Sequence, residues 1–213
     1  MISEKDIEKA LKTAEKTLKR RPYVDRLKNP FKVVVSTLLS ARTKDETTAI
    51  VSERLFSKVK TPKTLLKLTQ NELEHLVYPV SFYKNKARFL FGLSRMILED
   101  YGGKVPKTIE ELIKLPGVGR KTANLVISVA FGKKGVCVDT HVHRILNRWG
   151  TVSTQSPLET EMAIRRLIPS KLWSKINRIL VPYGKETCTP LSPYCASCRL
   201  NQICSKRGVE KFR

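Results

Sequence analysis

The chain is organised around Leu115 to Ala123, which reads L-P-G-V-G-R-K-T-A, and around Val138 to His141, which reads V-D-T-H. The first stretch predicts a tight glycine-rich turn that leads into a helix. Glycine lets a backbone come close to a ligand because it has no side chain. The positive end of the following helix adds to this, so the turn suits an anion such as a DNA phosphate. An ordinary turn between packed helices is the structural alternative.

Two residues near this turn carry chemical groups suited to covalent chemistry. Lys121 falls in the first turn of the predicted helix beside Arg120, and both the helix dipole and the neighbouring cation favour a neutral amine. A neutral amine can attack a carbon electrophile, whereas most lysines are only solvated surface charges. Asp139 is placed to cap the next helix, a role that is compatible with chemistry. His141 is interpreted as a supporting hydrogen-bonding residue and not as a catalyst.

The charge balance points to nucleic acid. The 213 residues include 41 Lys plus Arg against 19 Asp plus Glu, a formal net charge of +22. Lysine and arginine contacts to phosphates release counterions and give non-specific affinity for DNA. An anionic membrane or the ribosome are the alternatives, but the basic residues are not confined to one amphipathic helix, and no apolar run approaches membrane-spanning length. Without a secretion signal at its start, the sequence predicts an intracellular, nucleoid-associated protein.

Apolar periodicity predicts an all-α fold of roughly ten short helices. The first helix is expected to start near Ser3 and to end at Arg21-Pro22. The run Val33-Val34-Val35 is assigned to a helix, because no partner strand with matching alternation follows. Capping boxes, in which a Thr and a Glu three residues apart satisfy each other's amides, are predicted at Thr43–Glu46, Thr69–Glu72 and Thr108–Glu111. No linker marks a domain boundary.

Four cysteines form a C-x6-C-x2-C-x5-C cluster near the end of the chain: Cys188, Cys195, Cys198 and Cys204. In a reducing compartment such a cluster indicates metal and not disulfides. Four thiolates suit both zinc and an iron–sulfur cluster, and the spacing leaves that choice open. The segment lacks a convincing helix, so we expect metal to fold it. The fifth cysteine, Cys137, is expected to be a buried apolar residue.

Taken together, L-P-G-V-G-R-K-T-A-N, V-D-T-H and the cysteine spacing closely resemble endonuclease III, a DNA glycosylase/AP lyase family of the helix–hairpin–helix-Gly-Pro-Asp superfamily. The resemblance implies that Lys121 is the nucleophile, that Asp139 is its catalytic partner, and that the four cysteines hold a 4Fe–4S cluster. It also implies two helical domains with a DNA groove between them. A six-helix barrel with the helix–hairpin–helix would span residues 25–133, and an iron–sulfur domain would combine 1–24 with 134–213.

The resemblance assigns DNA contacts to the hairpin and to two wedge loops. The hairpin contacts would come from Leu115, Pro116, Gly117, Val118, Gly119 and Arg120. Bacterial members carry Gln where this chain has Arg42, and Gly-Leu-Tyr where it has Ser81-Phe82-Tyr83. Arg42 and Phe82 would still fill the gap left by a flipped base, by stacking and by wedging. An exposed loop arginine and a buried helix-start phenylalanine are the alternatives.

We therefore predict a bifunctional glycosylase of base excision repair that acts as a monomer on double-stranded DNA containing damaged bases or abasic sites. Oxidised pyrimidines are the expected lesions, and β-elimination is expected to nick the abasic strand. Two alternatives stand beside this prediction. One is a monofunctional mismatch glycosylase, although such relatives lack a lysine at the position of Lys121. The other is a non-catalytic iron–sulfur protein that binds DNA or senses redox state.

Overall fold

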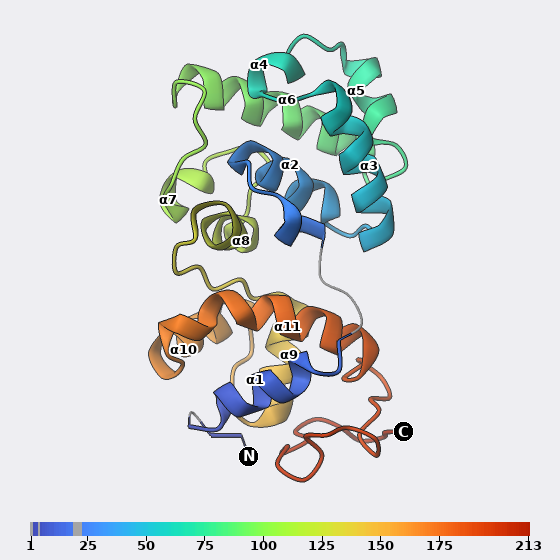
Figure 1. Cartoon of the computed structure of the whole chain (residues 1–213), viewed down its shortest axis with the longest axis vertical. Coiled ribbons are helices and arrows are strands. Elements are labelled where there is room, and N and C mark those ends of the chain that lie inside the picture. The colour runs from blue at the N-terminus through green and yellow to red at the C-terminus, as the bar shows by residue number, and fades with distance from the viewer. Residues whose placement is uncertain (1, 4, 19–22) are drawn as a thin grey trace. The chain divides into compact units, whose positions relative to one another are not determined.

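The computed structural model describes residues 2–3, 5–18 and 23–213. All regular elements in those ranges are helical, which confirms the predicted all-α class (Figure 1). No helix among the described residues is both long and apolar enough to cross a membrane. The elements in chain order are α1 (Ile7–Glu15), η1 (Tyr23–Arg26), α2 (Pro30–Ser40), α3 (Asp45–Lys58), α4 (Pro62–Leu65), α5 (Gln70–Val77), α6 (Tyr83–Glu99), α7 (Ile109–Leu112), α8 (Arg120–Phe131), α9 (Thr140–Trp149), α10 (Pro157–Leu167), η2 (Ser170–Leu172) and α11 (Trp173–Glu186).

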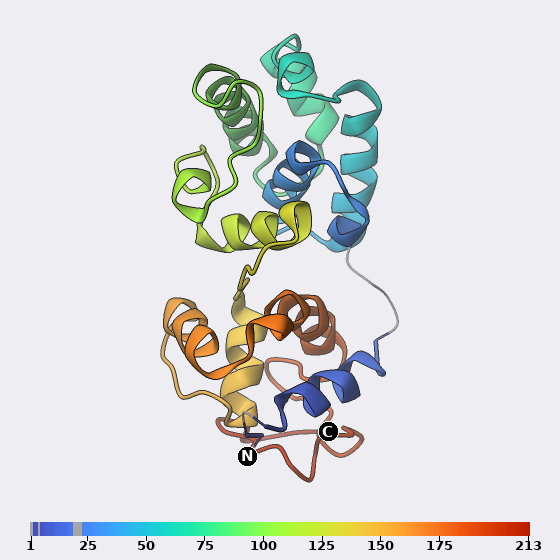
Figure 2. The same cartoon turned by 60° about the vertical axis from the view of Figure 1, so that its left-hand side comes forward.

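The chain divides into two compact units, and each has its own hydrophobic core. The first unit is Tyr23–Lys133, in which α2 packs against α3, α6 and α8 (Figure 2). Because α2 is surrounded, its side chains are buried on nearly every face, including the run Val33-Val34-Val35. A helix buried all round is apolar all round, which explains why these β-branched residues lie in a helix as predicted.

The second unit combines the described part of residues 1–22 with Lys134–Arg213. Here α11 packs against both α1 and α9, and α10 packs against α9. The buried aromatic rings of Trp149 and Tyr183 meet edge to face in this core, with their ring centroids 6.2 Å apart. Beyond α11 the chain continues as turns and loops that carry the four clustered cysteines. The N-terminal helix and the cysteine segment therefore belong to one folding unit.

Two predicted helix starts are wrong and two are confirmed. The first helix begins at Ile7 and not near Ser3, whose hydroxyl donates to Asp6 Oδ2 at 2.6 Å. This helix, α1, ends at Glu15. The predicted helix end at Arg21-Pro22 lies outside the described residues. The capping box at Thr43–Glu46 is absent, because Lys44 occupies the N-cap of α3 and makes no side-chain cap. The box at Thr69–Glu72 is confirmed. At Thr108–Glu111 the helix start is confirmed but the box is not: Thr108 caps α7 through the Glu111 N–H, while the Glu111 carboxylate accepts from the Thr108 hydroxyl at 2.6 Å and not from its backbone N–H.

Candidate functional site

The hairpin between α7 and α8 is shaped by Gly117. This residue has φ +75°, a conformation that disfavours any side chain. A Cβ there would also lie 2.9 Å from Leu38 Cδ1 and from the Phe89 ring. Gly119 behaves differently: it is the N-cap of α8, and no heavy atom lies within 4 Å of a Cβ built on it. Gly117 is thus required by the protein's own packing, whereas the space beside Gly119 is open.

Lys121 is the second residue of α8, directly after this turn. Both Lys121 and its neighbour Arg120 have exposed side chains. They stand at the helix end where the aligned peptide dipoles produce a positive potential. The turn therefore places an arginine and a lysine side chain at the positive end of a helix, on one exposed feature.

Asp139 caps the N-terminus of α9, as predicted from the sequence. Its Oδ1 atom accepts the N–H groups of His141 and Val142, both at 3.0 Å. The carboxylate is therefore fixed by two backbone donors at a helix start and is only partly buried. Lys121 belongs to the unit Tyr23–Lys133, and Asp139 belongs to the other unit.

His141 lies in the first turn of α9 and is half-buried. Burial lowers the pKa of its imidazole, and the nearby Asp139 carboxylate partly opposes that shift. Its Nδ1 atom lies 3.2 Å from Arg144 Nη2. A Cβ on Gly184 of α11 would lie only 2.7 Å from the same Nδ1, so α9 and α11 approach closely at this point. His141 is therefore closely packed against α11, at the start of the helix that Asp139 caps.

The four clustered cysteines act on one another electrostatically. The charges of Cys188, Cys198 and Cys195 each raise the pKa of Cys204, after the larger effect of burial. Burial likewise raises the pKa of Cys195. Backbone N–H groups lie against two of the sulfurs, from Leu200 to Cys198 Sγ at 3.3 Å and from Lys206 to Cys204 Sγ at 3.4 Å. Mutually close thiols with N–H donors suit a centre that binds them as thiolates, although within the described ranges no three His, Cys, Asp or Glu side chains are already arranged to hold a metal ion.

Sequence reasoning missed the residues that fix the cysteine segment to the helices. Arg148 is buried, and its guanidinium donates to Thr189 O at 2.7 Å, to Pro190 O at 2.5 Å and towards Cys188 Sγ at 3.5 Å. Arg144, one helical turn earlier, donates to Cys188 O at 2.8 Å. The sequence shows that Arg144 and Arg148 are four residues apart, but no neighbouring residue in the sequence distinguishes them from solvated arginines.

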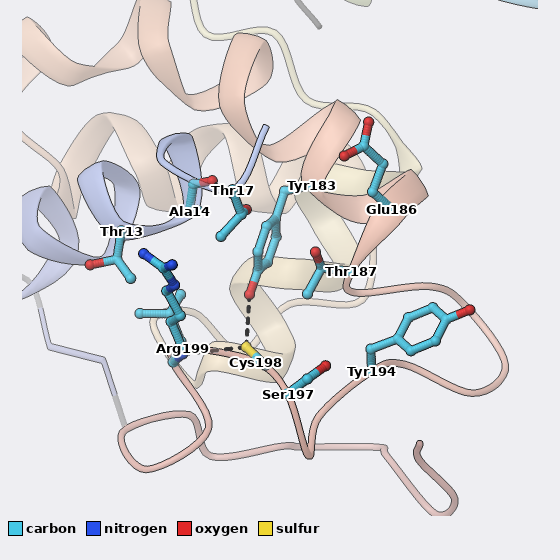
Figure 3. Close-up of a pocket in the computed structure, with 11 residues that line it drawn as sticks. Thr13, Ala14, Thr17, Tyr183, Glu186, Thr187, Tyr194, Ser197, Cys198 and Arg199 are labelled. Atoms are coloured by element: carbon cyan, nitrogen blue, oxygen red, sulfur yellow. Dashed lines mark hydrogen bonds between the residues drawn. The ribbon is translucent and has the colours of Figure 1, made fainter. Parts of the chain in front are cut away.

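Tyr183 of α11 supports the third cysteine of the cluster. Its hydroxyl lies 2.9 Å from Cys198 Sγ, and burial together with that sulfur raises the tyrosine pKa far above its ordinary value (Figure 3). Cys198 also borders a cavity of about 280 Å³, whose wall includes Thr13 of α1 and Thr17, which follows α1. The predicted metal-binding segment is therefore tied to α9 and α11 by hydrogen bonds, and it shares a cavity wall with α1. Cys137, as expected, is buried and lies outside this cluster.

The two predicted wedge residues lie on neighbouring loops of the unit Tyr23–Lys133. Arg42 follows α2, and Phe82 immediately precedes α6. Both have left-handed backbones, with φ of 56° and 57°. The Arg42 guanidinium carbon lies 5.3 Å from the Phe82 ring centroid, and 59% of the Phe82 surface is exposed. Phe82 is therefore not the buried helix-start residue of the structural alternative.

Comparisons with known proteins agree on one family. The profile of the "HhH-GPD superfamily base excision DNA repair protein" family matches residues 35–170. Endonuclease III of Thermotoga maritima is 46% identical over 203 residues, which cover 94% of this chain and 95% of that protein. A solved "non-covalent Endonuclease III-DNA Complex" has a TM-score of 0.87 and 36% identity over 97% of each chain. A "Trapped Endonuclease III-DNA Covalent Intermediate" has a TM-score of 0.84 at the same identity and coverage.

Proposed function

Because this chain belongs to the endonuclease III family of bifunctional DNA glycosylase/AP lyases of base excision repair, we propose that Lys121 is its nucleophile and Asp139 the catalytic partner. The observation that carries this proposal is the position of Lys121. It is an exposed amine in the first turn of a helix, one residue after the cationic Arg120 and directly after a turn with open space at Gly119. A similar structure, at 36% identity, is named as a trapped covalent endonuclease III–DNA intermediate.

The reaction follows from the chemistry of an amine at a sugar carbon. The unprotonated Lys121 amine attacks C1′, and the bond from C1′ to the damaged base breaks as the base leaves with its electron pair and takes up a proton. The Asp139 carboxylate stabilises the positive charge that develops on the sugar and assists the proton transfers. Opening of the sugar ring gives a Schiff base. Loss of a C2′ proton then expels the 3′ phosphate, which nicks the strand.

The substrate in this proposal is duplex DNA with an oxidised pyrimidine or an abasic site. The net charge of +22 supports phosphate binding, and the hairpin residues Leu115 to Arg120 would receive one phosphate at the start of α8. Arg42 and Phe82 would enter the gap left when the lesion is extruded. His141 would support Asp139, since both lie at the start of α9.

The cofactor in this proposal is a 4Fe–4S cluster held by the four clustered cysteines, Cys188, Cys195, Cys198 and Cys204. When bound, it supplies a redox-active cross-link among these thiolates. The buried Arg148 offsets part of the negative charge there, as it does for Cys195. In this reading the unit Tyr23–Lys133 corresponds to the helix–hairpin–helix domain, and the other unit corresponds to the iron–sulfur domain.

The test is borohydride trapping on a panel of duplexes with different lesions. Lys121→Gln keeps much of the size and polarity of lysine but has no basic amine. We expect it to fold and to bind lesion DNA, yet to form no reduced adduct and to nick no abasic site. Lys175→Gln is the matched control, because Lys175 is also an exposed lysine in the first turn of a helix. An adduct that persists in Lys121→Gln would assign the nucleophile to another amine.

A further inference from the structure

Lys86 of α6 is a buried cation to which the reaction above gives no role. Only 5% of its surface is exposed. Its Nζ atom donates to Leu39 O at 2.7 Å, to Ala41 O at 2.6 Å and to Thr43 Oγ1 at 3.1 Å. All three donors of an ammonium group thus have acceptors, as a buried charge requires. The two carbonyls belong to the C-terminal end of α2, where the helix dipole also favours a cation.

A second set of hydrogen bonds joins the same two loops. The Ser81 N–H donates to Thr43 Oγ1 at 3.1 Å, and Ser81 Oγ donates to Arg42 O at 2.7 Å. The Thr43 hydroxyl thus accepts from Lys86 and from Ser81. This is why Thr43 does not cap α3 as its sequence context predicted. The loop after α2 and the loop before α6 are fastened to each other by this network.

The fastened loops carry two residues in an unfavourable backbone conformation. Left-handed backbone costs about 1–2 kcal/mol for a residue with a side chain, and both Arg42 and Phe82 adopt it. Such conformations persist only where the surroundings fix them, and they gather at functional sites. Here the result is that the Arg42 guanidinium is held over an exposed Phe82 ring.

We propose, on the premise of the function proposed above, that Lys86 is a positioning residue for base extrusion. It holds the loops of Arg42 and Phe82 together, so that the two side chains enter the duplex as one preformed wedge. A preformed wedge avoids the cost of ordering two separate side chains on binding. It thereby helps to offset the unstacking of the extruded nucleotide. Burial lowers the pKa of Lys86 to about 8. Because this value is still above neutral pH, the side chain remains an ammonium there and keeps all three donors.

The experiment compares Lys86→Met with wild type on one lesion placed either in a base pair or in a single strand. We expect roughly 10- to 100-fold slower turnover on the paired lesion, the scale on which misplaced groups act. Turnover on the single strand should change less than about threefold, because no duplex has to be opened. Lys67→Met is the matched control, since it removes the same charge from an exposed side chain of the same unit.

A mutant cycle separates positioning from general destabilisation. If Lys86 acts through the wedge, Lys86→Met should add almost nothing in an Arg42→Ala/Phe82→Ala background. Equal loss on both substrates, or a full Lys86→Met effect in that background, would overturn the proposal. If Lys86→Met does not fold, Thr43→Val removes the shared acceptor while keeping the shape, and the same outcomes apply to it. Failure of the proposed function is distinguished from these outcomes, because wild type itself would then form no borohydride adduct.

Discussion

At the scale of single residues, substitutions of Asp139 can distinguish its role as a helix cap from a role in catalysis. Asn accepts the same two backbone N–H groups as Asp, so Asp139→Asn should change the stability of α9 by only tenths of a kcal/mol. The same change removes the negative charge, so we expect base release to slow by orders of magnitude. Cleavage of a preformed abasic site should be affected less, because the base has already left. Asp139→Ala, the control, should cost about 1 kcal/mol of stability as well.

These two activities are measured separately, as base release from lesion DNA and as nicking of abasic DNA. If Asp139→Asn released bases at the wild-type rate, the carboxylate would be a cap and nothing more. If Asp139→Asn and Asp139→Ala lost the same stability, the hydrogen bonds to His141 and Val142 would not matter to the fold.

The buried Lys86 gives the folded protein a pH dependence. Burial lowers its pKa from an ordinary 10.5 to about 8. Between those values the unfolded chain binds more protons than the folded chain, so the free energy of unfolding rises with pH in that window. We expect wild type to gain on the order of 1–3 kcal/mol relative to Lys86→Met between about pH 7 and about pH 10. Denaturant unfolding at several pH values checks this, and parallel profiles for the two proteins would contradict it.

At the scale of elements, the hairpin glycines should respond differently to the same substitution. Gly117→Ala places a side chain on a left-handed residue and drives its Cβ into Leu38 and Phe89. We expect it to cost roughly 2–4 kcal/mol of stability. Gly119→Ala meets no neighbour and has an ordinary φ of −87°, so it should cost about 1 kcal/mol or less. It should nevertheless weaken DNA binding, because a methyl group would fill the approach to the start of α8.

Thermal unfolding and DNA titration together check this pair of glycines. The decisive measurement is the affinity of Gly119→Ala, since that variant is expected to fold almost normally. If Gly119→Ala bound DNA as tightly as wild type, no phosphate would approach the backbone at this position. The hairpin would then be a packing motif, shaped by Gly117 alone.

Local patterns in the sequence were sufficient to predict the helices and several caps, but they could not reveal long-range hydrogen bonds. Asp139 was correctly predicted to be an N-cap, because capping depends on residues within one turn. Thr43 was wrongly assigned to a cap, because its hydroxyl oxygen accepts hydrogen bonds from the Ser81 N–H and from Lys86 Nζ, about 40 residues away in sequence. The roles of Lys86 and Arg148 were missed for the same reason: buried and solvated cations look alike in a sequence.

The family resemblance predicted more than the local sequence pattern did, because it also predicted the activity. The all-α class, the endonuclease III family and its activity are confirmed by the structure and by the related proteins. The roles of Lys121, Asp139 and the wedge residues remain predictions, as does the cluster.

At the scale of the whole molecule, the two hydrophobic cores should differ in how much their stability depends on bound metal. The core of Tyr23–Lys133 is built mainly from helices, and none of the four clustered cysteines belongs to it. The core of the other unit includes Tyr183 and Leu200, and Cys188, Cys198 and Cys204 pack against it. Residues after α11 form no helix, and their local backbone hydrogen bonds are those of turns, such as Cys198 N–H to Cys195 O and Cys204 N–H to Leu200 O. A bound cluster would therefore stabilise this unit directly, because metal binding contributes to folding free energy.

Loss of one ligand should accordingly unfold one unit and spare the other. Cys198→Ser retains a hydroxyl near Tyr183 and Leu200 but cannot hold iron as a thiolate does. We expect loss of iron and of the brown cluster colour. We also expect amide exchange protection to fall in residues 187–213 and in α11, while the core of Tyr23–Lys133 stays protected. Cys137→Ser is the matched control: the same substitution at a buried cysteine outside the cluster should leave the iron in place. Stoichiometric zinc without iron in the wild-type protein would refute the cluster assignment. Equal loss of protection in both units would show that the two cores unfold as one.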